Sequence, residues 1–154
     1  MTLDELLLEV PEFSGYIKNM PADIKDRCSI RVIPPGQIIH QKNFLLNYFA
    51  FVVKGSHRVI NEFENGNIYM IEKNEAINFV GEVTILAEQE RTSVTLETIT
   101  ECILYQMSRK DFERWIKQDI ELLYLISTKV AFKLYRSSSR SGATLFYPPS
   151  FLLL

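Results

Sequence analysis

The sequence is poor in cysteine and histidine, and this scarcity excludes several kinds of site. Cys28 and Cys102 lie far apart and form no Cys-x-x-Cys pair, so neither a disulfide framework nor a zinc or iron–sulfur centre is predicted. His40 and His57 are the only histidines, and neither has the nearby His and carboxylate residues that a metal site needs. We therefore predict no bound metal and two buried thiols.

Catalytic patterns are also missing from the chain. We find no Ser/His/Asp or Cys/His arrangement, no convincing pair of catalytic carboxylates and no phosphate-binding P-loop. An enzyme is therefore not expected.

Long apolar runs and a strong net charge are absent as well. No stretch approaches the roughly 20 apolar residues that cross a bilayer, and the N-terminus has no basic segment of the secretory type. We therefore expect a cytoplasmic protein without membrane contact. The net charge of −2 and the pI of about 5.7 argue against this chain holding DNA by itself.

What is present is enough apolar material for one domain with a real core, at 47% hydrophobic residues among 154. Helix-like spacing over residues 3–30, with a start signal at Pro21, predicts two short helices. Short β-branched and aromatic runs follow, and Asn65-Gly66 predicts a hairpin between two of them. These runs cover residues 37–40, 48–53, 57–62, 67–72, 94–99 and 103–107.

Helical signals return after the last of these runs. Ser108 has the character of an N-cap, and residues 111–117 are expected to form a short helix. A longer helix is predicted from Ile120, and we expect the serine run 137–139 to end or fray it. The chain is therefore predicted to be mainly β, an antiparallel sandwich or roll with flanking helices.

The most informative motif is Phe79-Val80-Gly81-Glu82, followed nine residues later by Arg91-Thr92-Ser93. A glycine lets backbone N–H groups close on a phosphate, a carboxylate accepts a ribose hydroxyl, and a guanidinium pairs with phosphate charge. Together these residue types resemble the phosphate-binding cassette of cyclic-nucleotide-binding domains.

The sequence on both sides of the cassette strengthens this resemblance. The segments 34–41, 48–55 and 107–112 resemble the opening strand, the aromatic strand before a glycine turn, and the step into the helix after the roll. Over residues 7–139 the chain resembles the sensory domain of Crp/Fnr-type bacterial transcription regulators. This resemblance implies a jelly-roll-like β-roll, an antiparallel double-stranded β-helix, over residues 1–118 and a dimerisation helix over 119–139. Residues 140–154 would then be a linker into a helix-turn-helix domain that this chain lacks.

The resemblance also implies a role for individual residues. Gly81 would offer backbone N–H to a ligand phosphate, Glu82 would bind the ribose 2′-hydroxyl, Arg91 would pair with the phosphate, and Thr92 would add a hydroxyl contact. Ser137 and Ser138 would contact adenine across a dimer. The dimer interface expected along the long helix contains Leu123, Ser127, Val130 and Leu134.

One departure from the family pattern concerns Arg91. If residues 100–108 match the family's last strand, the stretch back to Arg91 is one residue too long. Without a bulge, Thr92 would take the arginine position and Arg91 would point to the opposite face.

The sequence therefore predicts an effector-sensing, homodimeric domain of a transcription regulator, with a cyclic nucleotide such as cAMP as the implied effector and no other cofactor. DNA would be bound only through a module outside this chain. Two alternatives stay open. In the first, the cassette has lost nucleotide binding and senses another small molecule. In the second, the chain is a stand-alone interaction module that docks a partner through residues 152–154.

Overall fold

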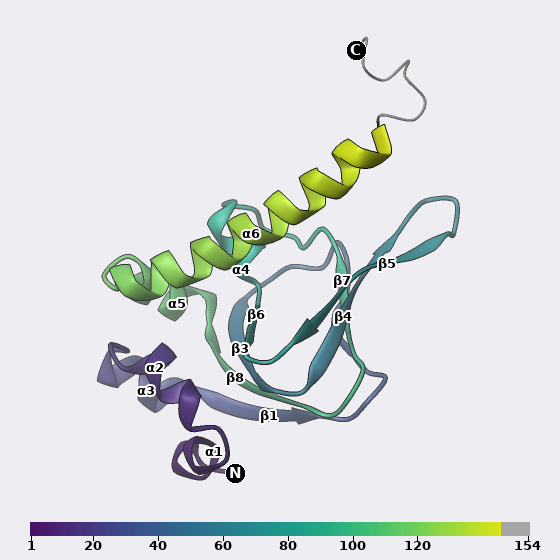
Figure 1. Ribbon diagram of the computed structural model, residues 1–154. Coiled ribbons are helices and arrows are strands. Elements are labelled where there is room, and N and C mark those ends of the chain that lie inside the picture. Colours follow the sequence, from purple (N-terminus) through teal and green to yellow (C-terminus); the bar gives the residue numbers. More distant parts are fainter. Residues whose placement is uncertain (146–154) are drawn as a thin grey trace. The chain divides into compact units, whose positions relative to one another are not determined.

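The structure is a computed structural model that describes the fold of residues 1–145, and it divides into two compact units. The first unit, residues 1–119, holds all the strands (Figure 1). The second begins at Ile120, and its described residues form the helix α6 (Ile120–Leu145). No helix in the described part of the chain is long and apolar enough to cross a membrane.

Two four-stranded antiparallel sheets form the first unit. Their strand orders are β1-β8-β3-β6 and β2-β7-β4-β5. The first sheet contains β1 (Ser29–Ile33), β3 (Tyr48–Lys54), β6 (Asn78–Val80) and β8 (Cys102–Ser108). The second contains β2 (Ile38–His40), β4 (Ser56–Glu62), β5 (Ile68–Glu75) and β7 (Thr95–Thr98). The predicted mainly β fold with flanking helices is confirmed.

The core between the sheets is aliphatic. Ile39 from β2 and Leu96 from β7 pack with residues of the other sheet, which include Val52 and Leu104. On β3 the side chains alternate, so Ala50 and Val52 join this core while the neighbouring phenylalanines face the other way. Every residue of β3 from Phe49 to Val53 is therefore buried.

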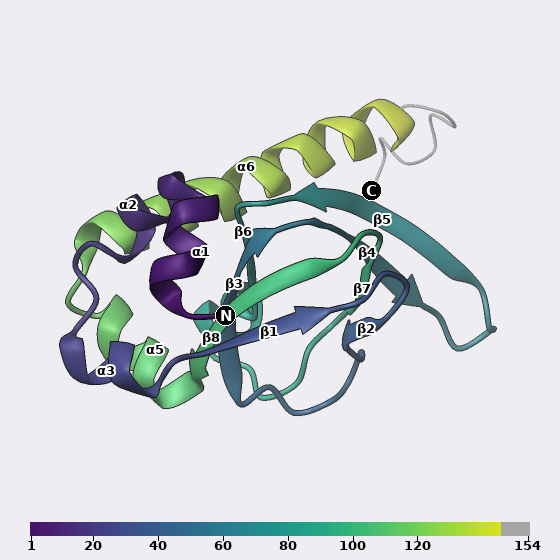
Figure 2. The same ribbon diagram turned by 90° about the horizontal axis from the view of Figure 1, so that it is seen from below.

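Short helices cover the other face of the first sheet with aromatic side chains. They are α1 (Leu3–Glu9), η1 (Pro11–Phe13), α2 (Ser14–Ile17), α3 (Ala22–Arg27) and α5 (Arg109–Ile116), which gather at one end of the sheets (Figure 2). Phe112 of α5 stacks on Phe49 at 3.7 Å between ring centroids, and Phe13 meets Phe51 edge to face. Phe49, Phe51, Phe79 and Tyr105 are buried, whereas Phe44 is exposed.

The end of α5 next to the sheet is fixed by capping and by an ion-pair network. Ser108 Oγ accepts a hydrogen bond from the Asp111 N–H at 3.1 Å, which confirms the predicted N-cap. Arg27 of α3 donates to both carboxylate oxygens of Asp111 at 3.0 and 2.8 Å, and Arg114 bonds Asp23. These contacts tie α3 to α5.

Two sequence expectations are corrected. The helix α6 continues through the serines at 137–139 to Leu145, so the serine run does not end it. Each serine costs only about 0.5 kcal/mol of helix propensity relative to alanine, which is too little to stop a running helix. Cys102 is buried as predicted, but Cys28 is only half-buried. The residues 146–154, including the expected docking segment 152–154, lie outside the described residues.

Candidate functional site

The cassette begins at a glycine that the backbone requires. Gly81 follows β6 with φ of +95° and forms the N-cap of the short helix α4 (Glu82–Leu86). A Cβ at this position would lie 3.0 Å from both Leu46 Cδ2 and the Tyr48 carbonyl oxygen. The left-handed backbone and this close approach together restrict the position to glycine, whether or not a ligand binds.

The first residue of α4 is the predicted carboxylate. Glu82 is 7% exposed and Thr84 is 8% exposed. Val83 and Leu86, on the same short helix, are exposed. Burial of Glu82 inside the domain fits a pocket residue rather than a solvated loop carboxylate.

The other end of the cassette places Arg91 and Thr92 on opposite sides of the chain. Arg91 is exposed, and its Nη1 donates to the Asn43 carbonyl oxygen at 2.8 Å. Thr92 is 9% exposed, and its hydroxyl donates to the Gln41 carbonyl oxygen at 2.9 Å. The inward side chain is therefore the threonine.

Strand β7 itself contains no bulge, whereas directly after it the N–H groups of Ile99 and Thr100 both donate to the Ser56 carbonyl oxygen, at 2.9 and 3.3 Å, so that two residues lie opposite one. Strand β7 pairs with β4 residue for residue, from His57 opposite Thr98 to Ile60 opposite Thr95. In the β2–β7 pair the register shift adds its extra residue to β2, between Ile38 and His40. Of the two residues, Thr92 is the buried one and Arg91 is exposed, and their predicted roles toward a ligand stay predictions.

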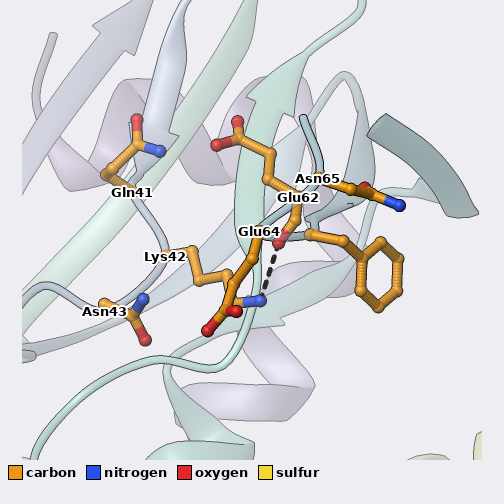
Figure 3. A pocket seen from close by; sticks show the side chains of 7 residues that line it. Gln41, Lys42, Asn43, Glu62, Glu64 and Asn65 are labelled. Carbon is orange, nitrogen blue, oxygen red and sulfur yellow. Dashed lines mark hydrogen bonds between the residues drawn. The ribbon is translucent and has the colours of Figure 1, made fainter. Parts of the chain in front are cut away.

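Residues 41–43, whose carbonyl groups accept hydrogen bonds from Arg91 and Thr92, form one wall of a cavity. This cavity of about 860 Å³ is open between residues 41–43 and the turn of the β4–β5 hairpin (Figure 3). Lys42 crosses it, and its ammonium donates to Asn61 Oδ1 and to the Glu62 carbonyl oxygen, both at 2.8 Å. The lining residues are Gln41, Lys42, Asn43, Glu62, Phe63, Glu64 and Asn65, so this cavity is not lined by the predicted cassette residues.

The predicted residues of the long helix all lie on α6, in the second unit. Ser137 and Ser138 are exposed, as are Ser127 and Leu134, whereas Leu123 and Val130 are half-buried. Their predicted roles in adenine binding and dimerisation stay predictions.

The histidines have structural surroundings. His57 is fully buried with its Nε2 3.3 Å from Asn74 Nδ2, and His40 packs beside the ring of Tyr48. Burial lowers the pKa of His40, which favours a neutral ring. Within residues 1–145, no three His, Cys, Asp or Glu residues are grouped so that they could hold a metal ion.

The sequence did not predict the residues that hold the two ends of the cassette in place. The carbonyl groups of Gln41 and Asn43 and the side chain of Leu46 support its two ends. Asn43 has φ of +69°, and asparagine is one of the few residues that tolerate this conformation, so a left-handed turn was the only available signal.

Comparison with known proteins identifies the family. The sequence pattern of the cyclic nucleotide-binding domain matches residues 30–119, which is more than half of the chain. The chain belongs to this family. The match contains both sheets and the whole cassette, so the cassette predicted from the sequence lies inside a cyclic nucleotide-binding domain.

Relatives of this cyclic nucleotide-binding domain include the cAMP-activated global transcriptional regulator CRP of Salmonella typhimurium, 26% identical over 119 residues. That alignment covers 77% of this chain and 57% of CRP, so the chain spans little more than half of its curated relative. The predicted resemblance to Crp/Fnr-type regulators is therefore confirmed over the part of the chain that this alignment covers.

Solved structures share the fold. The c-di-GMP responsive regulator CLP of Xanthomonas campestris has a TM-score of 0.72 at 19% identity, with 88% of this chain and 65% of CLP covered. A regulatory subunit of a cAMP-independent protein kinase A from Trypanosoma brucei has a TM-score of 0.66 at 17% identity, with 87% and 50% covered. These similarities extend the evidence for the fold.

Proposed function

We propose that the chain is the effector-sensing domain of a Crp/Fnr-type transcription regulator, built as a jelly-roll-like β-roll. The observation that carries this proposal is the family match over residues 30–119, together with a buried Glu82 next to Gly81 in the cassette. The effector would bind in this cassette and would be a cyclic nucleotide, as in the cAMP-activated relative CRP. The domain performs no catalysis in this proposal.

Control of DNA binding would be allosteric. The effector would favour one packing of the α6 helices in a homodimer and so set the spacing of DNA-binding modules that lie outside this chain. Exposed apolar side chains on α6 support a contact with a second copy. They are Ile120, Tyr124, Phe132, Leu134 and Tyr135.

A ligand panel tests the sensing function. The melting temperature of the chain would be measured with cyclic nucleotides and with nucleosides, because a ligand that binds only the folded state raises it. We expect a shift that Glu82→Gln removes. The absence of any shift across the whole panel would refute a sensing role for this cassette.

Light scattering after size-exclusion chromatography tests the dimer. Leu134→Glu places a charge among the predicted interface residues and is expected to give the mass of a monomer. Thr128→Glu tests the neighbouring exposed face of the same helix, because Thr128 is exposed and lies between Tyr124 and Phe132 at helical spacing. Equal masses for both variants and the wild type would argue against dimerisation through this face.

One observation favours a second candidate, a cassette that senses something other than a cyclic nucleotide. Thr92 points inward where the resemblance expects a guanidinium. The kinase regulatory subunit from Trypanosoma brucei is described as cAMP-independent, and a variant of it that includes a threonine-to-arginine change is described bound to cAMP. The fold is therefore compatible with a cyclic nucleotide as effector and also with a different kind of effector.

A further inference from the structure

We propose that the cavity beside the β4–β5 hairpin is a second ligand site, which takes a small diamine by displacing the Lys42 ammonium. The cavity, about 860 Å³ in volume, is lined by none of the predicted cassette residues. This site is therefore separate from the effector site of the proposed function and does not depend on it.

The partners of the Lys42 ammonium suit any primary ammonium group. It donates to Asn61 Oδ1 and to the Glu62 carbonyl oxygen, both at 2.8 Å, and the second of these bonds is drawn in Figure 3. It also lies 5.7 Å from the centroid of the Phe63 ring, within the range of a cation–π contact. An ammonium group has three N–H donors and no acceptor, so two oxygens and an aromatic face match what it needs. These three partners form an ammonium cradle.

The charges around the cradle favour a second ammonium group. Glu62 and Glu64 line the cavity and are exposed, and within the part of the chain that the structure describes neither carboxylate has an ion-pair partner. The other polar side chains of the lining are uncharged amides, so Lys42 is one cation facing two carboxylates. A diamine can place one ammonium in the cradle and the other against the carboxylates, whereas an anion would meet two like charges.

Lys42 is an occupant that a ligand can displace. Its side chain is half-buried and spans from the segment 41–43 to the hairpin, so a flexible stem is held in one conformation at a cost in side-chain entropy. Because the cavity is open, water can solvate the ammonium once it leaves. A tethered group competes with a free ligand at an effective concentration of about millimolar. A diamine, which adds contacts to the carboxylates that Lys42 lacks, can therefore replace it.

Isothermal titration of putrescine, a four-carbon diamine, into the whole chain at constant ionic strength tests the site. We expect the wild type to bind at about millimolar concentration, and Lys42→Ala, which lacks the internal competitor, to bind at least about tenfold more tightly. Glu64→Gln removes one carboxylate and should weaken binding to the wild type by about tenfold. Lys110→Ala is the matched control and should bind like the wild type, because Lys110 is exposed on α5 and does not line the cavity.

Melting temperatures give a second readout. The atoms that Lys42→Ala removes are those of n-propylamine, so this amine can fill the vacated cradle. It should raise the melting temperature of Lys42→Ala and leave that of Lys110→Ala unchanged, because a ligand that binds only the folded state stabilises it. Tetramethylammonium carries the same charge without N–H donors and should raise neither melting temperature.

Three results would overturn the proposal. If the wild type binds no putrescine, even where Lys42→Ala responds, Lys42 is a structural tether and the cavity is no ligand site. Equal binding of tetramethylammonium and putrescine would show general charge screening. Tighter binding of N-acetyl-lysinamide than of putrescine would assign the cradle to a lysine of a partner protein. If Lys42→Ala does not fold, the wild type and Glu64→Gln still decide, and every one of these results leaves the sensory function of the cassette standing.

Discussion

Substitution of the cassette glycine provides a direct test of the geometry on which the site rests. Gly81→Ala adds a Cβ that would lie 3.0 Å from Leu46 Cδ2 and from the Tyr48 carbonyl oxygen, at a φ of +95°. Gly66→Ala is the matched control, because Gly66 has φ of +84° with nothing within 4 Å of its Cβ. The two variants share the backbone penalty and differ in the contact.

The expected costs follow from these two contributions. A left-handed conformation costs a residue with a Cβ about 1–2 kcal/mol, and alanine recovers roughly 0.4–1 kcal/mol through the unfolded state. Gly66→Ala should therefore lose about 1 kcal/mol of unfolding free energy. The contact at Gly81 adds about 1–3 kcal/mol of overpacking, which gives a total of about 2–4 kcal/mol.

A third glycine extends the series. At Gly55 the added Cβ would lie 2.2 Å from the Glu101 carbonyl oxygen and 2.9 Å from Cys102 Cα. Because both neighbours are backbone atoms, the strands themselves must move, and Gly55→Ala should cost more than about 4 kcal/mol.

Urea unfolding of the three variants measures these differences. At this chain length 1 kcal/mol corresponds to about 3 °C in melting temperature, so Gly81→Ala should melt roughly 6–12 °C below the wild type. If Gly81→Ala lost no more stability than Gly66→Ala, the approach of residues 46 and 48 to the cassette would be wrong. A Gly55→Ala variant as stable as Gly66→Ala would equally contradict the turn between β3 and β4.

Three further predictions concern the α5 region. Ser108→Ala removes the N-cap and should cost about 1 kcal/mol in urea unfolding. Arg27→Met should lower the melting temperature by only a few degrees at neutral pH, since its ion pairs are partly exposed. Arg27 holds the pKa of Asp111 below its usual value near 3.8, so this contribution is present above that pH and is lost as pH falls through the lower folded-state pKa. The wild-type and Arg27→Met melting temperatures should therefore converge below about pH 4, and a constant gap would contradict the ion pair. Trp115→Phe loses the buried indole N–H bond to Asp119 at 2.9 Å and should cost about 2–4 kcal/mol, whereas a loss under about 1 kcal/mol would show that this bond contributes little.

The sequence was most informative where local chemistry is strong. The runs of β-branched and aromatic residues matched six strands, and Asn65-Gly66 correctly predicted the β4–β5 hairpin. Strands β1 and β6 were missed. Their pairing comes from distant partners, β8 and β3, so nothing in their own short sequences required a strand.

The helix α4 was also missed, for a related reason. Its five residues follow a glycine and are too few to show a helical period, so the sequence predicts no helix there. The left-handed Gly81 begins the helix, and its first turn is closed by the bond from the Ile85 N–H to the Gly81 carbonyl oxygen.

The choice between Arg91 and Thr92 shows where a single sequence stops being decisive. Either residue fits the cassette pattern, because a one-residue slip changes the face without changing the composition. The deciding contacts come from residues 43–46, almost fifty positions earlier, and they are backbone hydrogen bonds that leave no mark on residue type. Only Asn43, whose φ is positive, is of a residue type that reflects this backbone arrangement.

Both ends of the cassette therefore depend on the same support. Leu46 packs where a side chain at Gly81 would stand, and the Gln41 carbonyl fixes the Thr92 hydroxyl. Lys42, between them in sequence, is bonded to the β4–β5 hairpin. Three backbone hydrogen bonds at about 1 kcal/mol each therefore oppose a slip that would turn Arg91 inward.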